Sequence, residues 1–138
     1  MAPVSVTLRD NLQAKIQSGH QTWLADEPVE AGGTDTGPTP TQMLLGALGS
    51  CIAITMKLYA QRKEWPLEGV DVELEMERFN GSDYPGFEGK AAFVHEIRKK
   101  ITLHGPLDES QRRRINDIGE MCPVHRALQY PTVFVEKE

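Results

Sequence analysis

The sequence has 138 residues, of which 39% are apolar and 25% are charged, a composition typical of an ordinary globular protein. A chain of this length buries about two thirds of its unfolded surface on folding, so a single domain needs no disulfide or metal to hold it together. The net charge of −5 argues against a nucleic-acid partner, because affinity for phosphate backbones depends on lysine and arginine.

The first segment, residues 1–30, predicts a small β meander. Apolar and polar residues alternate in VSVTL, LQAKIQ and QTWLA, as they do in half-buried strands, and Ser18-Gly19 marks a turn. The N-terminus has no cationic stretch followed by a long apolar run, so we expect no signal peptide and a cytoplasmic protein. In a reducing compartment, a pair of cysteines is more often reactive than structural.

Residues 39–63 predict a long central helix. The glycine- and proline-rich loop before it leads to Thr39 as N-cap, Pro40 as first helical residue and Gln42 as partner in a capping box. Nearly every face of this helix is apolar, which predicts a helix surrounded by protein. Its glycines and Lys57 argue against a membrane span.

The second half predicts a β hairpin over residues 69–104 and a mixed segment over residues 107–138. The stretches VDVELEMERF and FVHEIRKKITL alternate, and their polar faces carry opposite charges, so we expect them to pair. After them come a helix capped by Asp108 and Gln111, a Cys-Pro turn, and a final strand TVFVE. Together these elements predict one α+β domain that spans residues 1–138.

The sequence MCPVHR suggests a reactive thiol at Cys122. Pro123 fits the first position of a helical turn, which places Cys122 at or near an N-cap. Free amide groups there, together with His125 and Arg126, favour the thiolate and so predict a lowered pKa for Cys122. The alternative is a buried cysteine that caps a short turn, and the hexapeptide leaves both open.

The other cysteine, Cys51, lies inside the apolar helix in register with Leu44, Leu48 and Thr55, on the face that we expect to be most buried. A buried free cysteine usually behaves as a small hydrophobic residue. Gly46 and Gly49 predict a kink or a break just before it, because glycine weakens a helix.

A metal site built on Cys122 and His125 is a third possibility for the cysteines. It would need two further ligands, and the spacing of the available side chains does not fit a zinc pattern. We therefore expect no metal and no cofactor. The remaining candidate ligands are Cys51, His20, His95 and His104.

Two stretches together resemble the OsmC/Ohr superfamily (osmotically inducible protein C and organic hydroperoxide resistance protein), and within it the OsmC-like branch. They are DEPVEAGGTDTGPTPTQMLLGALGSCIAITMKLYAQRKEWPLEGVDVEL and, later, GPLDESQRRRINDIGEMCPVHRAL. The resemblance covers nearly the whole chain from about residue 20 and implies an OsmC-like α+β fold. In that fold, β-sheets pack around the long buried central helix of an intertwined homodimer.

The resemblance also implies a thiol-dependent peroxidase that reduces organic hydroperoxides. Cys51 would attack the peroxide and become a sulfenic acid, Cys122 would condense with it to a disulfide, and an external dithiol would restore both thiols. An apolar pocket around the helix would favour apolar hydroperoxides. Gln42 and His125 are candidate supporting residues.

One departure from the family pattern keeps a second hypothesis open. Hydroperoxide reductases of this group carry an acidic residue nine or ten positions before the first cysteine, ion-paired to an arginine, whereas Gln42 and Thr41 stand here. Lys15 or His20 could supply a cation, without the bidentate fork of arginine. The alternative function is a non-peroxidase OsmC-like dimer that binds a small apolar ligand or senses oxidation.

Overall fold

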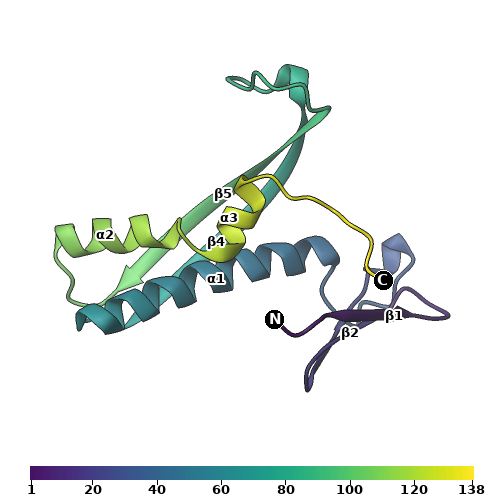
Figure 1. The fold of residues 1–138 in the computed structure, drawn as a ribbon, viewed down its shortest axis with the longest axis horizontal. Helices are drawn as coiled ribbons and strands as arrows, with labels where there is room; N and C mark the ends of the chain where they lie inside the picture. The colour runs from purple at the N-terminus through teal and green to yellow at the C-terminus, as the bar shows by residue number, and fades with distance from the viewer. The chain divides into compact units, whose positions relative to one another are not determined.

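The computed structural model describes residues 1–138 and has the predicted α+β architecture (Figure 1). The chain divides into two compact units, Met1–Gly46 and Ala47–Glu138, and each unit contains its own antiparallel sheet. The boundary between the units falls within the long helix α1, Pro40–Lys63. The prediction of a single domain over residues 1–138 stays a prediction.

The first unit contains a three-stranded meander with the strand order β1-β2-β3. Its strands are β1 (Ser5–Leu8), β2 (Ala14–Ser18) and β3 (Gln21–Ala25), within the segment 1–30 where the alternation places them. Gly19 has a φ of 57° in the tight turn between β2 and β3, a conformation that glycine adopts without steric cost. A short 3-10 helix η1, Val29–Ala31, follows the sheet.

The carboxylate of Asp26 organises the loop that leads from β3 to α1. This side chain is only 1% exposed, and it accepts hydrogen bonds from the hydroxyls of Thr34 at 2.6 Å and Thr36 at 2.7 Å. The backbone N–H groups of Glu27, Thr34 and Thr36 also donate to it. Because all these donors favour the charged form, the pKa of Asp26 is held well below its ordinary value, first by the Thr34 hydroxyl and then by that of Thr36.

Local sequence signals set both ends of α1. Thr39 and Gln42 form the predicted capping box, with Gln42 N–H to Thr39 Oγ1 at 3.2 Å and Thr39 N–H to Gln42 Oε1 at 2.9 Å. At the other end, Glu64 adopts a left-handed φ of 57° and the Trp65 N–H donates to the Ala60 carbonyl at 2.9 Å. This hydrogen bond is that of a Schellman cap. Between these ends α1 is one helix, so the predicted break near its glycines is not observed.

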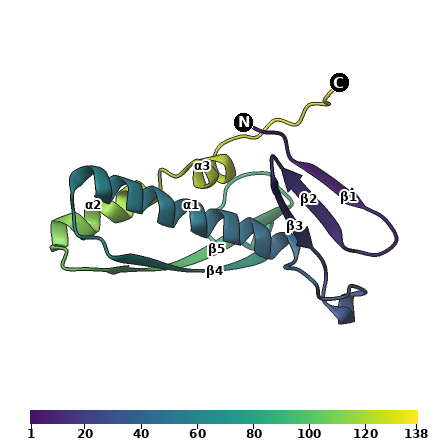
Figure 2. The same ribbon diagram turned by 90° about the horizontal axis from the view of Figure 1, so that it is seen from below.

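The second unit is built on a long hairpin of β4 (Gly69–Asn80) and β5 (Phe93–His104), joined through the 3-10 helix η2 (Gly81–Asp83). The strands pair from Gly69 opposite His104 to Asn80 opposite Phe93, and α1 from Ala47 onward lies along the hairpin (Figure 2). A Cβ atom added to Gly49 would lie 3.2 Å from Leu74 Cδ1. Gly49 therefore permits the close approach of α1 and β4, which explains why glycine suits this position.

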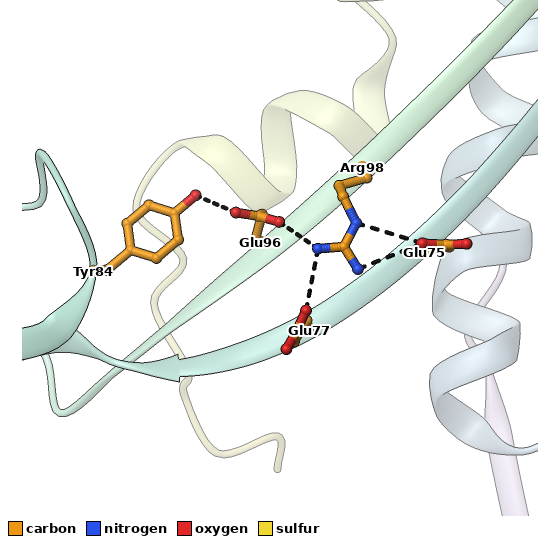
Figure 3. A network of polar contacts seen from close by, with 5 residues as sticks. All are labelled: Glu75, Glu77, Tyr84, Glu96 and Arg98. Atoms are coloured by element: carbon orange, nitrogen blue, oxygen red, sulfur yellow. Dashed lines mark hydrogen bonds and ion pairs between the residues drawn. The ribbon is translucent and has the colours of Figure 1, made fainter.

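The outer face of the hairpin carries a charge network centred on Arg98 (Figure 3). Its guanidinium pairs with Glu75 at 3.4 Å, Glu77 at 3.1 Å and Glu96 at 2.6 Å, and Glu96 also accepts from the Tyr84 hydroxyl at 2.6 Å. The predicted pairing of oppositely charged strand faces is therefore confirmed. Since the Arg98 side chain is 48% exposed, the network fixes strand register more than it adds stability.

Two short helices follow the hairpin: α2 (Glu109–Gly119) and α3 (Pro123–Gln129). The predicted capping box of α2 is present, with Gln111 N–H to Asp108 Oδ1 at 2.8 Å and Asp108 N–H to Gln111 Oε1 at 3.0 Å. The Arg112 guanidinium ties α2 to the end of β5, since it donates to the carbonyls of Leu103 at 2.9 Å and Gly105 at 2.8 Å.

The predicted final strand TVFVE is wrong for this single chain. Residues 131–138 have no regular secondary structure, and the side chains of Val133, Phe134 and Val135 are 82–90% exposed. An extended segment becomes a strand only when its backbone groups pair with a neighbouring strand, and no strand of this chain pairs with it.

The core of the second unit forms on one face of α1. Leu48, Ile52 and Met56 are buried there together with Ile115 of α2. The opposite face of α1 stays open, and Ile54 and Leu58 on it are 58% and 56% exposed. The helix is thus covered on one face by its own chain, whereas its composition predicted burial on all faces. By length and composition alone α1 could also cross a membrane, a property that it shares with core helices of soluble proteins.

Candidate functional site

Cys51 lies on α1 at the edge of the core and is half-buried. The fully buried stripe of the helix is Leu48, Ile52 and Met56, which follow one another at intervals of four residues. Cys51 packs on the flank of this stripe. The expectation that Cys51 shares the most buried face is therefore wrong, because that face is centred one residue further along the helix. The position leaves its thiol partly accessible.

Cys122 is the N-cap of α3, as the Cys-Pro pattern predicts. Its φ and ψ are −65° and 146°, Pro123 is the first helical residue, and the His125 N–H donates to Cys122 Sγ at 3.3 Å. The side chain is fully buried in the core cluster that contains Leu48 and Ile115.

The predicted lowering of the Cys122 pKa is wrong. Burial is the largest influence on this thiol, and it raises the pKa of Cys122, because the thiolate loses its hydration. The His125 N–H acts in the opposite direction without reversing the result. Helix-terminus donors and nearby cations were the basis of the prediction, and a thiol with no exposed surface loses more from desolvation than it gains from them.

The fold brings the two cysteines together, although they are far apart in the sequence. Cys51 packs against the core cluster that contains Cys122, and its proximity raises the pKa of Cys122 further. Both are free thiols. The pair thus consists of one half-buried thiol on α1 and one sealed thiol at the start of α3, in mutual contact.

The two candidate supporting residues differ in their relation to this pair. His125 is directly linked to it, since its backbone N–H caps the Cys122 sulfur, and its ring atom Nδ1 is buried without a hydrogen-bond partner. Gln42 lies in the first turn of α1, where its side-chain oxygen is engaged in the capping box with Thr39. The structure thus gives Gln42 a helix-capping role, and no carboxylate stands in its place.

Sequence reasoning missed Lys99. It lies on β5 opposite Leu74, between Ile97 and Ile101 on the apolar face of the hairpin, and its side chain is 25% exposed. The signal was present, because residues two apart on a strand share a face and Lys99 has the same parity as both isoleucines. No group of three or more His, Cys, Asp or Glu side chains is arranged to hold a metal ion.

A known family matches the part of the chain that contains both the apolar helix with Cys51 and the Cys-Pro start of α3. The model of the OsmC-like protein family matches residues 33–137, which include both cysteines. The chain belongs to the OsmC-like family. Because this match includes all of α1, the apolar helix is part of an OsmC-like fold.

Solved structures share the OsmC-like fold over nearly the whole chain. An OsmC-like protein from Mycoplasma pneumoniae superimposes with a TM-score of 0.73 at 21% identity, covering 94% of this chain and 87% of that one. The organic hydroperoxide resistance protein OsmC from Legionella pneumophila has a TM-score of 0.66 at 16% identity, covering 94% and 89%. The organic hydroperoxide resistance protein OhrB of Bacillus subtilis has a TM-score of 0.62 at 17% identity, covering 94% of this chain and 90% of that one. No curated protein sequence matches this chain significantly.

Proposed function

We propose that this OsmC-like protein reduces organic hydroperoxides through a sulfenic acid and disulfide cycle at Cys51 and Cys122. The observation that carries the proposal is the contact between two free thiols of unequal exposure. The family match and the names of two structural neighbours, both called organic hydroperoxide resistance proteins, support a redox role in peroxide stress.

The proposed cycle has three balanced steps. The Cys51 thiolate attacks one oxygen of ROOH, the O–O bond breaks, and the products are Cys51–SOH and, after protonation of the alkoxide, ROH. The Cys122 thiol then attacks the sulfur of Cys51–SOH, which forms the disulfide and releases water. An external dithiol finally reduces the disulfide by two electrons and is itself oxidised.

The unequal exposure of the thiols supports this order of events. A hydroperoxide in solvent can reach the half-buried Cys51, whereas Cys122 has no exposed surface. Because burial raises its pKa, Cys122 remains a protonated thiol and a poor nucleophile for peroxide in the resting protein. The Cys122 thiol reacts only after the electrophilic sulfur of Cys51–SOH has formed beside it.

A homodimer is part of the proposal. The open face of α1 carries Ile54 and Leu58, which are 58% and 56% exposed, and contiguous apolar faces of this kind are usually covered by a partner. We expect Leu58→Glu to shift the protein from dimer to monomer in analytical ultracentrifugation, while Arg113→Glu on the exposed face of α2 leaves it a dimer. A cytoplasmic location fits the cycle, since its dithiol needs a reducing compartment.

Stopped-flow mixing of the reduced protein with cumene hydroperoxide tests the cycle. We expect rapid loss of one equivalent of peroxide and formation of one disulfide per chain in the wild type. Cys51→Ser should lose the reaction, and Cys122→Ser should retain the first step but stop at a sulfenic acid that dimedone traps. Equally slow consumption of peroxide by the wild type and by Cys51→Ser would exclude the cycle.

Gln42 favours a second candidate function, a non-peroxidase OsmC-like dimer that binds a small apolar ligand or senses oxidation. An uncharged amide stands where the related reductases carry an acidic residue. Gln42→Glu is a clean test, because glutamate completes a capping box as well as glutamine does and the helix start is preserved. A gain in peroxidase rate supports the first function, and a slow wild type with no gain in Gln42→Glu supports the second.

A further inference from the structure

Lys99 is an unusual residue for the inner face of the β4–β5 hairpin. Its neighbours on that face are Leu74, Ile97 and Ile101, and the nearest acidic atom is Glu120 Oε1 at 4.0 Å. Because the Glu120 side chain is 67% exposed and the distance is at the limit for an ion pair, this carboxylate stabilises Lys99 little. The ammonium therefore retains free hydrogen-bond donors beside an apolar surface.

Lys99 lines a pocket of about 150 Å³ in the second unit, between the hairpin and α3. Three of the lining residues are aliphatic and three carry polar ends. A cavity of this volume is large enough for a benzene-sized molecule. The lining residues are Leu48, Ile97, Lys99, His125, Leu128 and Gln129.

The ring of His125 also lines the pocket, but its Nδ1 atom is closed off from it. The ring atom Nδ1 of His125 is buried and has no hydrogen-bond partner. Buried polar atoms almost always have partners, because an unpaired one loses its hydration without compensation. Because Nδ1 has no solvent-accessible surface, a ligand in the pocket cannot pair with it, and the polar groups available to a ligand are those of Lys99 and Gln129.

We propose that this pocket binds a small carboxylate with an apolar body of about the size of a benzene ring. Lys99 compensates the charge, Gln129 can donate hydrogen bonds, and Leu48, Ile97 and Leu128 enclose the body. A single ammonium matches the single negative charge of a carboxylate. The aliphatic side chains of the pocket have no hydrogen-bond donors for the additional oxygens of inorganic phosphate. A neutral ligand would leave the Lys99 ammonium without a close partner.

The pocket is next to the cysteines but does not depend on their chemistry. Leu48 shares a core cluster with Cys122, and the backbone of His125 caps the Cys122 sulfur at 3.3 Å. A bound carboxylate therefore lies close to the thiol pair. The pocket is present in the reduced protein, so carboxylate binding can be measured without any peroxide. The result therefore tests the pocket separately from the proposed cycle.

Titrations of the reduced full-length protein by two-dimensional amide NMR test the site with benzoate, benzamide and inorganic phosphate. We expect benzoate to shift the amide signals of Ile97, Lys99 and residues 125–129, and to bind at least roughly tenfold more tightly than benzamide, the value of one charge-assisted hydrogen bond. Phosphate should shift these signals only at much higher concentration.

The neighbouring lysine provides a matched control. Lys99→Met should abolish the preference for benzoate over benzamide, Lys99→Arg should keep it, and Lys100→Met should leave it unchanged, because Lys100 pairs opposite Glu73 on the outer face. The proposal is overturned if benzoate does not bind the wild type, if benzamide or phosphate binds as tightly, or if Lys100→Met has the same effect as Lys99→Met.

Discussion

Gly119, the last residue of α2, controls how closely that helix approaches α1. A Cβ atom added there would overlap with Met56 Cε and lie 3.3 Å from Ile52 Cγ2, so only glycine fits without displacement of these side chains. The chain then reaches Cys122 within three residues, and the Cys122 N–H donates back to the Gly119 carbonyl at 3.4 Å. The spacing of α2 from α1 therefore helps to place Cys122 beside Cys51.

Gly119→Ala should test this packing through its effect on stability. Overpacking of a filled core costs about 1–3 kcal/mol, while alanine in place of glycine in a helix contributes about 1 kcal/mol. Gly46→Ala, in α1, is the matched control, because no atom lies within 4 Å of its added Cβ and only the favourable contribution remains. The free energies of unfolding of the two variants should differ by about 1–3 kcal/mol in favour of Gly46→Ala.

Urea unfolding at one fixed protein concentration measures these free energies, and the kinetics of the thiol cycle give an independent readout. After one equivalent of cumene hydroperoxide, Gly119→Ala should oxidise Cys51 at the wild-type rate but form the disulfide roughly tenfold more slowly, since small displacements of reacting groups are costly. If both alanine variants are stabilised equally, α2 does not pack tightly against Met56 and Ile52, and the reasoning fails.

Four further predictions concern individual side chains. Iodoacetamide at neutral pH should modify Cys51 at least roughly tenfold faster than Cys122. The pKa of Cys122 is raised above its ordinary 9.0. The stabilisation from the protonated Cys122 thiol is therefore complete below pH 9 and is lost as the pH rises through the folded-state pKa. In thermal melts, the stability difference between the wild type and Cys122→Ala should shrink only at alkaline pH. The pKa of Asp26 is lowered from 3.8, so the stabilisation from its carboxylate is present above that pH and lost in acid. The stability difference between the wild type and Asp26→Asn should shrink as the pH falls below 3.8. A stability difference independent of pH would contradict the role of the Asp26 charge. Glu64→Gly should raise the free energy of unfolding by about 0.5 kcal/mol in urea titrations, because glycine removes the cost of the left-handed cap but adds entropy to the unfolded chain.

Local signals in the sequence predict local structure well. The capping boxes at Thr39 and Asp108 and the helix start at Pro123 depend on residues within one turn of each other, and all three are present. The strand pairing follows in the same way, since alternation fixes which charged side chains share a face.

Properties that depend on residues distant in the sequence could not be predicted from local patterns. The donors around Cys122 are local and suggest a thiolate, but the burial that raises its pKa comes from α1 and α2. The final strand depends on a partner strand that this chain does not supply. The alternation of β5 places Lys99 on the apolar face, but the pocket that it lines also needs residues of α1 and α3.

The sealed position of Cys122 also governs how the proposed disulfide is reopened. An incoming reductant can approach only the sulfur of Cys51, because the other sulfur has no exposed surface. The transient mixed disulfide therefore forms on α1, and Cys122 departs as the leaving group. A leaving thiol with a high pKa departs slowly, so we expect the burial of Cys122 to slow the regeneration half of the proposed cycle.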